Sequence, residues 1–377
     1  MSIKNNLLSN KVIWDVNAAI KSFHILSRYQ YWKRKYDKKK EIELTLPYIS
    51  SNPNVIFVGT DERQDNSGFY QALSSVCGNV IPFTKDDGRW GQYDSGIPHR
   101  KEKNYQRLKE LIENAPNCID CVLMQAWGAS FWVKDLNELK KKYKFKIINI
   151  DLDSRLIFER IPYIGRQNPG IFGISPCVDL ELVSTKEIVN WYHKEGIPAI
   201  YFPLASSTSF YYPMDNIEKR YDVGFIGSNY GLRGEEVRFL QAHGIKVEAR
   251  GPGWPHGSIN FEDNNLFFNQ CKIVLGIGNI SYCKNFYNPK LRDYDAPMSG
   301  SVYITNRTPE LEQDYLENKE IILFDTWDEA VKRIRELLGD PDRLRAIRKN
   351  AYRAAKEKHT YEKQLKELFD TLSKMQR

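Results

Sequence analysis

Short apolar runs alternate with helix-like segments along most of this chain, and this alternation restricts the possible fold more than any other feature. A first series of runs occupies 54–59, 79–83, 121–127, 145–151, 180–184 and 200–204. A second series occupies 221–227, 245–250, 273–277, 301–305 and 320–324. Because helix-like segments separate most of the runs, the pattern predicts right-handed crossovers between parallel strands. We therefore expect an α/β protein with two Rossmann-like domains facing across a cleft.

The domain boundaries follow from the same pattern. A chain of 377 residues is long for one domain and sufficient for two. The stretch 203–213 is rich in Ser, Pro and aromatic residues and has no periodicity, so we interpret it as the linker. We expect a basic helical extension, two Rossmann-like domains, and a C-terminal helix that packs back toward the N-terminal domain, over residues 1–45, 46–206, 207–358 and 359–377.

Composition restricts the protein class. Hydrophobic residues make up 41% and charged residues 27%, which is usual for a soluble globular protein. No run approaches the roughly 18 apolar residues of a membrane span, and the first residues lack the apolar core of a signal peptide. These features predict a cytoplasmic protein.

The net charge of +7 is concentrated in basic runs with interleaved aromatic residues, at 31–40 and 140–146. Solvated helix faces are the first interpretation, and contact of residues 31–40 with an anionic membrane surface is the second. We expect no nucleic-acid partner, because the sequence contains no zinc finger, RNP motif or recognition-helix pattern.

The stretch 290–305 has the composition of a sugar-nucleotide site. Lys290 and Arg292 could face a diphosphate, and a carboxylate in the same stretch could accept hydrogen bonds from ribose hydroxyls. Gly300 precedes the next strand and would allow the backbone to approach a ligand closely.

Two glycine-containing turns follow strands of the second half. The turn 227–233 would present backbone N–H groups and the positive end of a helix to an anion, with Ser228 and Arg233 as further donors. Gly251 opens a Gly-Pro-Gly-Trp turn after the next strand, where a base or ribose would lie. A plain strand-to-helix turn and a simple Pro-Gly turn are the alternatives.

Carboxylates follow two strands of the first half. Asp151 and Asp153 end a hydrophobic strand, and such a pair either chelates Mg²⁺ or Mn²⁺ or forms a helix cap beside a cleft-lining carboxylate. The loop 59–68 carries Asp61, Glu62 and Asp65, which are candidates for a general base or for binding acceptor hydroxyls. A solvated polar loop is the alternative.

Together these motifs resemble the CgeB-like (spore maturation protein-like) glycosyltransferases, a bacterial family of the two-domain GT-B type. The matching segments are 222–233, 251–254, 291–300, 320–324 and 359–361, with weaker matches at 151–153 and 180–185. The resemblance implies a nucleotide-sugar domain over 207–358 and an acceptor domain over 46–206. It also implies that Ser228 and Arg233 lie near phosphate and Asp295 near ribose.

Related two-domain transferases carry a Glu-x7-Glu motif at this point in the chain. Here Asp295 stands at the position of the second Glu and Tyr287 at that of the first. The aspartate can still accept two hydroxyls, with one methylene less reach.

We therefore predict a metal-independent glycosyltransferase that needs no cofactor and uses a UDP-, dTDP- or GDP-sugar. The acceptor would be a surface glycan, a glycolipid or a glycoprotein. Arg233, Lys290 and Arg292 would stabilise the departing diphosphate.

A base from the first half, Asp61, Asp65 or Asp151, would act only if the reaction inverts configuration. Two alternatives stay open: a metal-dependent transferase that uses Asp151 and Asp153, and a non-catalytic nucleotide- or glycan-binding protein.

Overall fold

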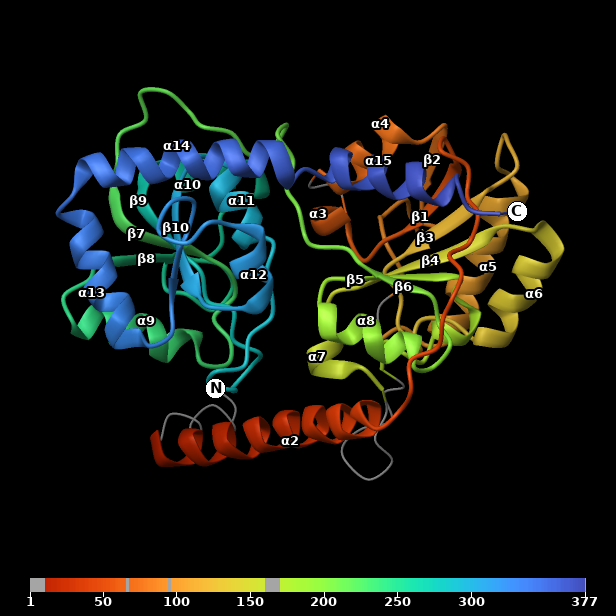
Figure 1. Cartoon of the computed structure of the whole chain (residues 1–377), viewed down its shortest axis with the longest axis horizontal. Coiled ribbons are helices and arrows are strands. Elements are labelled where there is room, and N and C mark those ends of the chain that lie inside the picture. Colours follow the sequence, from red (N-terminus) through yellow and green to blue (C-terminus); the bar gives the residue numbers. More distant parts are fainter. Residues whose placement is uncertain (1–10, 66–67, 94–95, 160–169, 377) are drawn as a thin grey trace. The chain divides into compact units, whose positions relative to one another are not determined.

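The computed structural model describes residues 11–65, 68–93, 96–159 and 170–376. The chain forms two compact domains (Figure 1). The N-terminal domain comprises Lys38–Tyr211 and Ala355–Arg377, and the C-terminal domain comprises Met1–Asp37 and Tyr212–Ala354.

The N-terminal domain contains a six-stranded parallel sheet in the order β2-β1-β3-β4-β5-β6. Its strands are β1 (Asn54–Val58), β2 (Asn79–Pro82), β3 (Cys121–Met124), β4 (Lys146–Asp151), β5 (Leu180–Val183) and β6 (Ala199–Tyr201). Its helices are α3 (Glu62–Asp65), α4 (Phe69–Val76), α5 (Arg100–Glu113), α6 (Val133–Tyr143), α7 (Ser154–Ile157), the 3₁₀ helix η1 (Ser175–Cys177), α8 (Lys186–His193) and α15 (Tyr361–Leu372).

The C-terminal domain contains a five-stranded parallel sheet in the order β11-β10-β9-β7-β8. Its strands are β7 (Tyr221–Ile226), β8 (Val247–Arg250), β9 (Cys271–Leu275), β10 (Val302–Asn306) and β11 (Ile322–Phe324). Its helices are α2 (Lys11–Asp37), α9 (Arg233–Ala242), η2 (Phe261–Asp263), α10 (Asn264–Gln270), α11 (Arg292–Met298), α12 (Pro309–Asp314), α13 (Trp327–Leu338) and most of α14 (Pro341–Lys358).

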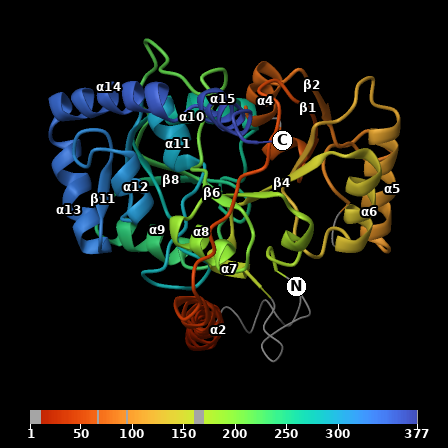
Figure 2. The same ribbon diagram turned by 45° about the vertical axis from the view of Figure 1, so that its right-hand side comes forward.

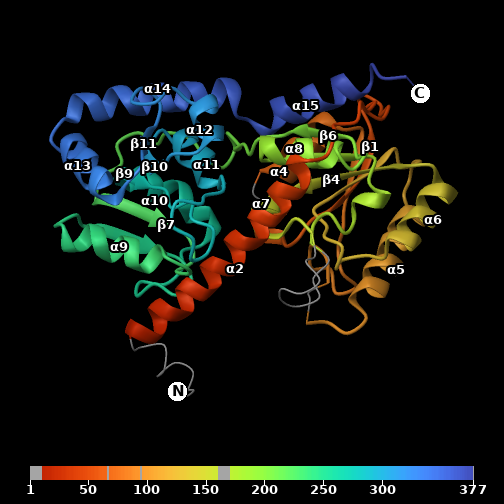
Figure 3. The same ribbon diagram turned by 60° about the horizontal axis from the view of Figure 1, so that its bottom comes forward.

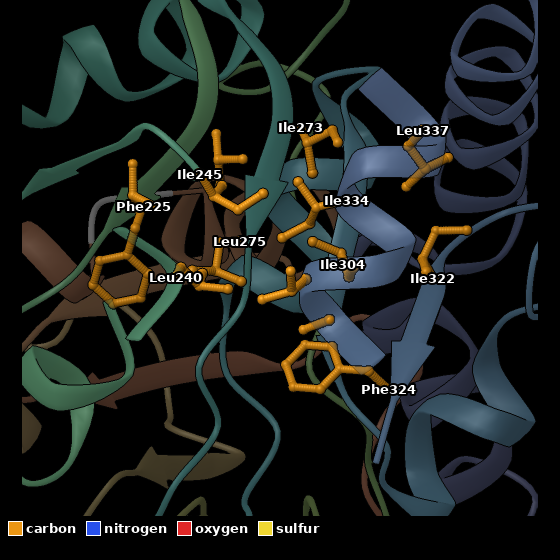
Figure 4. Close-up of a cluster of buried hydrophobic side chains, with 14 of the residues drawn as sticks. Phe225, Leu240, Ile245, Ile273, Leu275, Ile304, Ile322, Phe324, Ile334 and Leu337 are labelled. Atoms are coloured by element: carbon orange, nitrogen blue, oxygen red, sulfur yellow. The ribbon is translucent and has the colours of Figure 1, made fainter. Parts of the chain in front are cut away.

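Most strands of both sheets are buried on both faces. Every residue of β3, β5 and β10 is buried, as expected for a parallel sheet with helices on each side. In the C-terminal domain, Leu240 of α9 and Ile334 of α13 pack against Phe225 and Leu275 of the sheet (Figure 4). Each such buried side chain contributes about 1.5–3 kcal/mol through removal of apolar surface from water. The predicted fold class, two Rossmann-like α/β domains, is confirmed.

The N-terminal and C-terminal segments each have a clear attachment within one domain. The ring of Tyr361 in α15 lies 5.2 Å from that of Phe69 in α4. Helix α2 is seen along its length in Figures 1 and 3 and nearly end-on in Figure 2. Its residue Tyr29 contacts Phe286 of the C-terminal domain, with ring centroids 4.7 Å apart. Among the described residues, no helix combines the length and apolar character needed to cross a membrane.

The strand orders locate where a ligand would bind. In the N-terminal sheet the order reverses between β1 and β3, and in the C-terminal sheet between β7 and β9. Helices that follow the two strands at such a switch point go to opposite faces of the sheet, which leaves a crevice at the carboxyl ends of the strands. The functional residues are therefore expected around Val58 and Met124 in one domain and around Ile226 and Leu275 in the other.

Candidate active site

Arg292 lies at the switch point of the C-terminal sheet. Its Nη1 donates a hydrogen bond to the carbonyl of Ile226 at 2.6 Å, and its Nη2 to the carbonyl of Ile277 at 3.3 Å. Ile226 ends β7 and Ile277 follows β9, so the side chain connects the carboxyl ends of the two strands. The guanidinium also lies over the ring of Phe225, 4.6 Å from its centroid. A permanent positive charge is thereby fixed in the crevice.

Arg233 adds a second cation beside the first. Its Nη1 donates to the carbonyl of Ser228 at 3.0 Å, and its guanidinium lies 4.3 Å from the ring centroid of Tyr230. Burial, and then the charge of Arg292, lower the pKa of Arg233 to about 10. The side chain therefore stays protonated at neutral pH while its charge is poorly solvated.

The arginine pair is incompletely satisfied. The Nε atoms of Arg233 and Arg292 are buried and have no hydrogen-bond partner among the described residues. The hydrogen bonds of the two guanidiniums within the described chain go to main-chain carbonyls. Two close cations held in this way repel each other, and a bound anion would offset that repulsion. The arrangement can therefore hold a phosphate or diphosphate.

Gly227 is located between the two arginines. A Cβ at Gly227 would lie 2.8 Å from Nη1 of Arg292 and 3.3 Å from Nη1 of Arg233, and its φ of 152° is one that L side chains rarely adopt. A Cβ at Gly251, where φ is 135°, would collide with the carbonyl of Gly227. That carbonyl accepts a hydrogen bond from Nε1 of Trp254 at 2.7 Å. Both glycines are thus required by close packing around the arginine pair.

Three amides of the turn 227–233 are used within the domain. The amide of Gly227 donates to the carbonyl of Arg250 and the amide of Asn229 to that of Pro252, both at 2.8 Å. The amide of Leu232 donates to the carbonyl of Ser281 at 3.2 Å. Neighbouring loops of the same domain occupy these three donors. Arg233 is the cation that this turn offers to a ligand.

Asp293 determines how the stretch 290–300 is folded. This carboxylate is buried and accepts hydrogen bonds from the amide of Lys290, at 2.6 Å, and from the hydroxyl of Tyr303 in β10. Burial raises the pKa of Asp293. Asp293 thereby joins the start of α11 to the sheet and orients Arg292, which precedes it. Asp295, half-buried, lies in the same short helix.

Gly300 lies away from the arginine pair. It follows α11 and directly precedes Ser301 and β10, so it is at the amino edge of the parallel sheet, whereas Ile226 and Gly227 are at the carboxyl edge. Its φ of 67° requires glycine, and a Cβ there would lie 2.8 Å from Cγ of Pro213. Gly300 therefore allows close packing against Pro213 and does not approach a ligand at the arginine pair.

A cavity of about 370 Å³ opens beside the first turn of α9, which carries Arg233. Its lining residues are Leu232, Glu235, Glu236, Phe239, Asn279, Lys284, Asn285, Tyr287, Asp325, Thr326, Trp327 and Asp328. Oε1 of Glu236 accepts a hydrogen bond from Nε1 of Trp327 at 3.2 Å, while Oε2 has no partner in the described chain. Burial raises the pKa of Glu236 to about 8. This carboxyl could not be recognised from the sequence, because an acid in the first turn of a helix is usually solvated.

The N-terminal domain has its own pocket, of about 350 Å³, at the switch point between β1 and β3. The lining consists of Thr60, Asp61, Gln92, Tyr93, Arg100, Gln125, Trp127, Ala129, Ser130, Ile150, Leu152 and Asp153. Two carboxylates, two amides and an indole ring suit a polyhydroxylated ligand, because the polar groups can bind hydroxyls and the ring can cover an apolar sugar face. Of the three candidate bases, only Asp61 lines this pocket.

The carboxylates of Asp65 and Asp151 accept hydrogen bonds from groups of their own domain and do not line the pocket. Oδ1 of Asp65 accepts from the amide of Thr60 at 3.1 Å, and Asp151 accepts from the hydroxyl of Tyr192 at 2.8 Å and the amide of Ser154 at 3.1 Å. Burial raises the pKa of each carboxyl to about 7. Asp151 therefore binds the first amide of α7, while Asp153, at the N-cap position without a side-chain capping hydrogen bond, lines the pocket. Across the described ranges, no group of three or more His, Cys, Asp or Glu side chains could hold a metal ion.

Comparison with known proteins identifies the C-terminal half. Residues 234–370 match the family model described as "Glycosyl transferase-like". Most of the C-terminal domain is therefore similar to this glycosyltransferase family. The match includes α9, α11 and the strands between them, and it confirms the predicted enzyme class. No curated protein sequence matches the chain.

Solved glycosyltransferase structures share the fold over most of the chain. A sucrose-phosphate synthase from Thermosynechococcus elongatus is 12% identical, with a TM-score of 0.58, covering 84% of this chain and 98% of the other. Anabaena HepE in complex with UDP and glucose is 10% identical, with a TM-score of 0.58, and coverage is 86% and 100%. An alpha-glucosyltransferase in complex with UDP and a 13-mer DNA is 12% identical, with a TM-score of 0.57, and coverage is again 86% and 100%. At these identities the likeness concerns the fold, which is of the GT-B type.

Proposed function

We propose that this protein transfers a sugar from a nucleoside-diphosphate sugar to a hydroxyl group of a glycan-containing acceptor, without a metal ion. The observation that carries the proposal is the arginine pair, Arg233 and Arg292, at the switch point of the C-terminal sheet. The negative charge that develops on a departing diphosphate needs fixed positive charge, and pre-oriented cations supply it without reorganisation during the reaction. Lys290, immediately before α11, is the third proposed cation.

The donor is proposed to be a UDP-, dTDP- or GDP-sugar. Asp295 would accept hydrogen bonds from ribose, and Gly227, Ser228 and Gly251 would form the wall beside the diphosphate. Two of the solved structures with this fold are described as complexes with UDP, which supports a nucleotide donor. We add Glu236 and Tyr287 to the proposed site, because both line the neighbouring cavity.

The acceptor is proposed to bind in the N-terminal pocket. Asp61 is the preferred base if the sugar is transferred with inversion, since it lines the pocket whereas Asp65 and Asp151 do not. A general base must reach the acceptor hydroxyl within hydrogen-bond distance. Trp127 and Asp153 would position the acceptor sugar. We propose a surface glycan, a glycolipid or a glycoprotein as the acceptor class, and we propose no nucleic-acid partner.

Metal independence and the absence of a cofactor are part of the proposal. The alternative, a metal-dependent transferase, requires the carboxylates of Asp151 and Asp153 to share an ion. The hydrogen bonds that Asp151 accepts from Tyr192 and Ser154 favour a capping role instead. The finer family assignment, CgeB-like, and a position at the inner face of the cytoplasmic membrane are proposed on the sequence motifs and on the basic segment 31–40.

A thermal-shift panel of nucleoside diphosphates and their sugars tests the function. A bound donor should stabilise the folded protein by mass action and so raise its melting temperature. At a donor concentration a hundredfold above Kd, the free energy of unfolding should rise by roughly 2.7 kcal/mol. We expect one nucleotide series to stabilise the wild type and an Arg345→Met control, whose guanidinium is exposed on α14, but not Arg292→Met. If no nucleotide stabilises the wild type, the transferase proposal is wrong and a glycan-binding function takes its place.

A further inference from the structure

Helix α2 has two apolar faces, and one of them is buried. Ala18, Ile25, Tyr29, Trp32 and Tyr36 are buried. On this side the ring of Tyr29 contacts Phe286, as described above. Since an α-helix turns about 100° per residue, the five buried side chains fall within about 60° of one another around the axis. This face anchors the helix.

The opposite face carries a second apolar row that is open to solvent. Ile13 is 39% exposed, Val16 55%, Ile20 51%, Phe23 68% and Tyr31 50%. By the same helical geometry these five side chains lie within about 80° of one another, on the side away from the buried row. We call this row the α2 stripe. A soluble protein normally exposes such side chains singly, so five in one row indicate a binding surface.

Helix α2 and the three residues that follow it are strongly basic. Residues 11–40 contain nine Lys and Arg residues against two Asp residues, a net +7, which equals the net charge of the whole chain. Arg34 falls within the angular range of the stripe and Lys35 about 40° outside it, whereas Lys21 and Arg28 fall nearer the buried row. Lys21 and Arg34 are exposed. The surface is therefore apolar and cationic at once.

We propose that the α2 stripe docks on an anionic lipid bilayer, with the apolar side chains among the acyl chains and the lysine and arginine side chains at the headgroups. This combination is that of an interfacial helix, in which apolar burial and attraction to anionic lipid act together. A nucleic acid would use the cations but gain nothing from Phe23 and Ile20. A second copy of this chain would bury the apolar row but would bring the same positive charge against it.

Docking through this face would leave the anchoring face in place. The loop that α2 holds contains Tyr282 and Phe286 and continues to Lys290 and Arg292. The loop that packs on α2 thus leads directly to Arg292, so binding of α2 to a bilayer would place the arginine pair close to the membrane in the chain. The inference concerns a surface and does not depend on the reaction proposed above.

Co-sedimentation with vesicles tests the proposal on the full chain. We expect the wild type to bind phosphatidylcholine vesicles that contain phosphatidylglycerol and not to bind vesicles of phosphatidylcholine alone. The double variant Ile20→Ser/Phe23→Ser should lose at least about tenfold in binding, because burying each side chain is worth about that factor or more. Leu316→Ser, which removes a side chain 56% exposed elsewhere on the same domain, should bind like the wild type.

Three results would overturn it. The first is equal binding of the double variant and the wild type to anionic vesicles, with unchanged melting temperatures. The second is a wild-type dimer in light scattering that the double variant abolishes while neither protein binds vesicles. The third is binding to duplex DNA, without vesicle binding, that Lys21→Gln/Arg34→Gln weakens and the double variant leaves unchanged.

Discussion

The Nη1 atom of Arg292 donates to the carbonyl of Ile226 at 2.6 Å, so that a residue of α11 closes the carboxyl end of β7. The contact places a cation at the point where the strand order of the C-terminal sheet reverses. Arg233 brings a second cation to the same point from the first turn of α9. The fold thereby concentrates positive charge where a parallel α/β sheet binds its ligand.

Loss of the Arg292 guanidinium should impair the reaction more than it impairs folding. Arg292→Met keeps much of the packing on Phe225 and removes the charge. We expect kcat/KM to fall about 10²–10³-fold, the usual effect of removing one donor that stabilises developing negative charge. Steady-state kinetics with a defined donor measure this. Activity within threefold of the wild type, with Arg345→Met as control, would exclude Arg292 from the charge-stabilising role.

Gly227 should tolerate no side chain. In Gly227→Ala the new methyl group would stand 2.8 Å from Nη1 of Arg292, so the arginine must move or the strand end must shift. We expect a loss of about 1–3 kcal/mol in the free energy of unfolding and weaker nucleotide binding. The matched control is Gly339→Ala, where the nearest atoms would be at ordinary contact distance. Equal stability of the two variants in urea titrations would contradict the packing described around the arginine pair.

The two strand-end carboxylates of the N-terminal domain should behave differently. Asp61→Asn should reduce kcat about 10²–10⁴-fold if Asp61 is the base. Asp151→Asn should leave kcat close to that of the wild type, because Asp151 faces Tyr192 and Ser154 and does not line the pocket. The pH profile of kcat distinguishes the roles, since only loss of a base removes its acidic limb. The reverse result, an inactive Asp151→Asn and an active Asp61→Asn, would assign the base to Asp151.

Glu236 should make the stability of the C-terminal domain depend on pH. Burial raises the pKa of this carboxyl from 4.5 in the unfolded chain to about 8 in the folded domain. Between these values the folded protein holds a proton that the unfolded chain releases, so the free energy of unfolding falls as the pH rises from about 5 to 8. Glu236→Gln should remove about 1–3 kcal/mol of this dependence. Urea titrations at the two pH values give the result, and Glu235→Gln, at the less buried neighbour, is the control.

Removal of metal ions should have no effect on the proposed reaction. Treatment with EDTA followed by buffer exchange should leave the rate of sugar transfer unchanged, and Mn²⁺ should not increase it. Loss of activity that Mn²⁺ restores would support the metal-dependent alternative at Asp151 and Asp153.

The sequence predicted the sheets well and the site only in part. Strands such as 221–227 and 301–305 are recognisable because a buried parallel strand is a largely apolar run. The roles of Asp151 and Gly300 could not be read in the same way. Whether a strand-end aspartate faces a pocket or caps the next helix depends on Tyr192, which is distant in sequence. Gly300 stands in a small-residue turn beside a strand, as a ligand-binding glycine would. What it packs against is Pro213, which is distant in sequence.

Residues that the sequence did not indicate share one property. Glu236 and Trp127 lie on ordinary-looking segments, and only the crossovers bring them to the carboxyl ends of the strands. The motif at 290–300 pointed to the correct part of the chain, but the side chain that orients Arg292 is Asp293, through Tyr303 and the amide of Lys290.

The central claim is that Arg233 and Arg292 bind the diphosphate of a nucleotide donor. Isothermal titration of the wild type and of Arg292→Met with the nucleoside diphosphate that stabilises the protein best tests this most directly. We predict that the wild type binds and that Arg292→Met binds at least about tenfold more weakly, since a charge-assisted hydrogen bond contributes about 1.5–3 kcal/mol. Equal affinity of the two proteins would contradict the account.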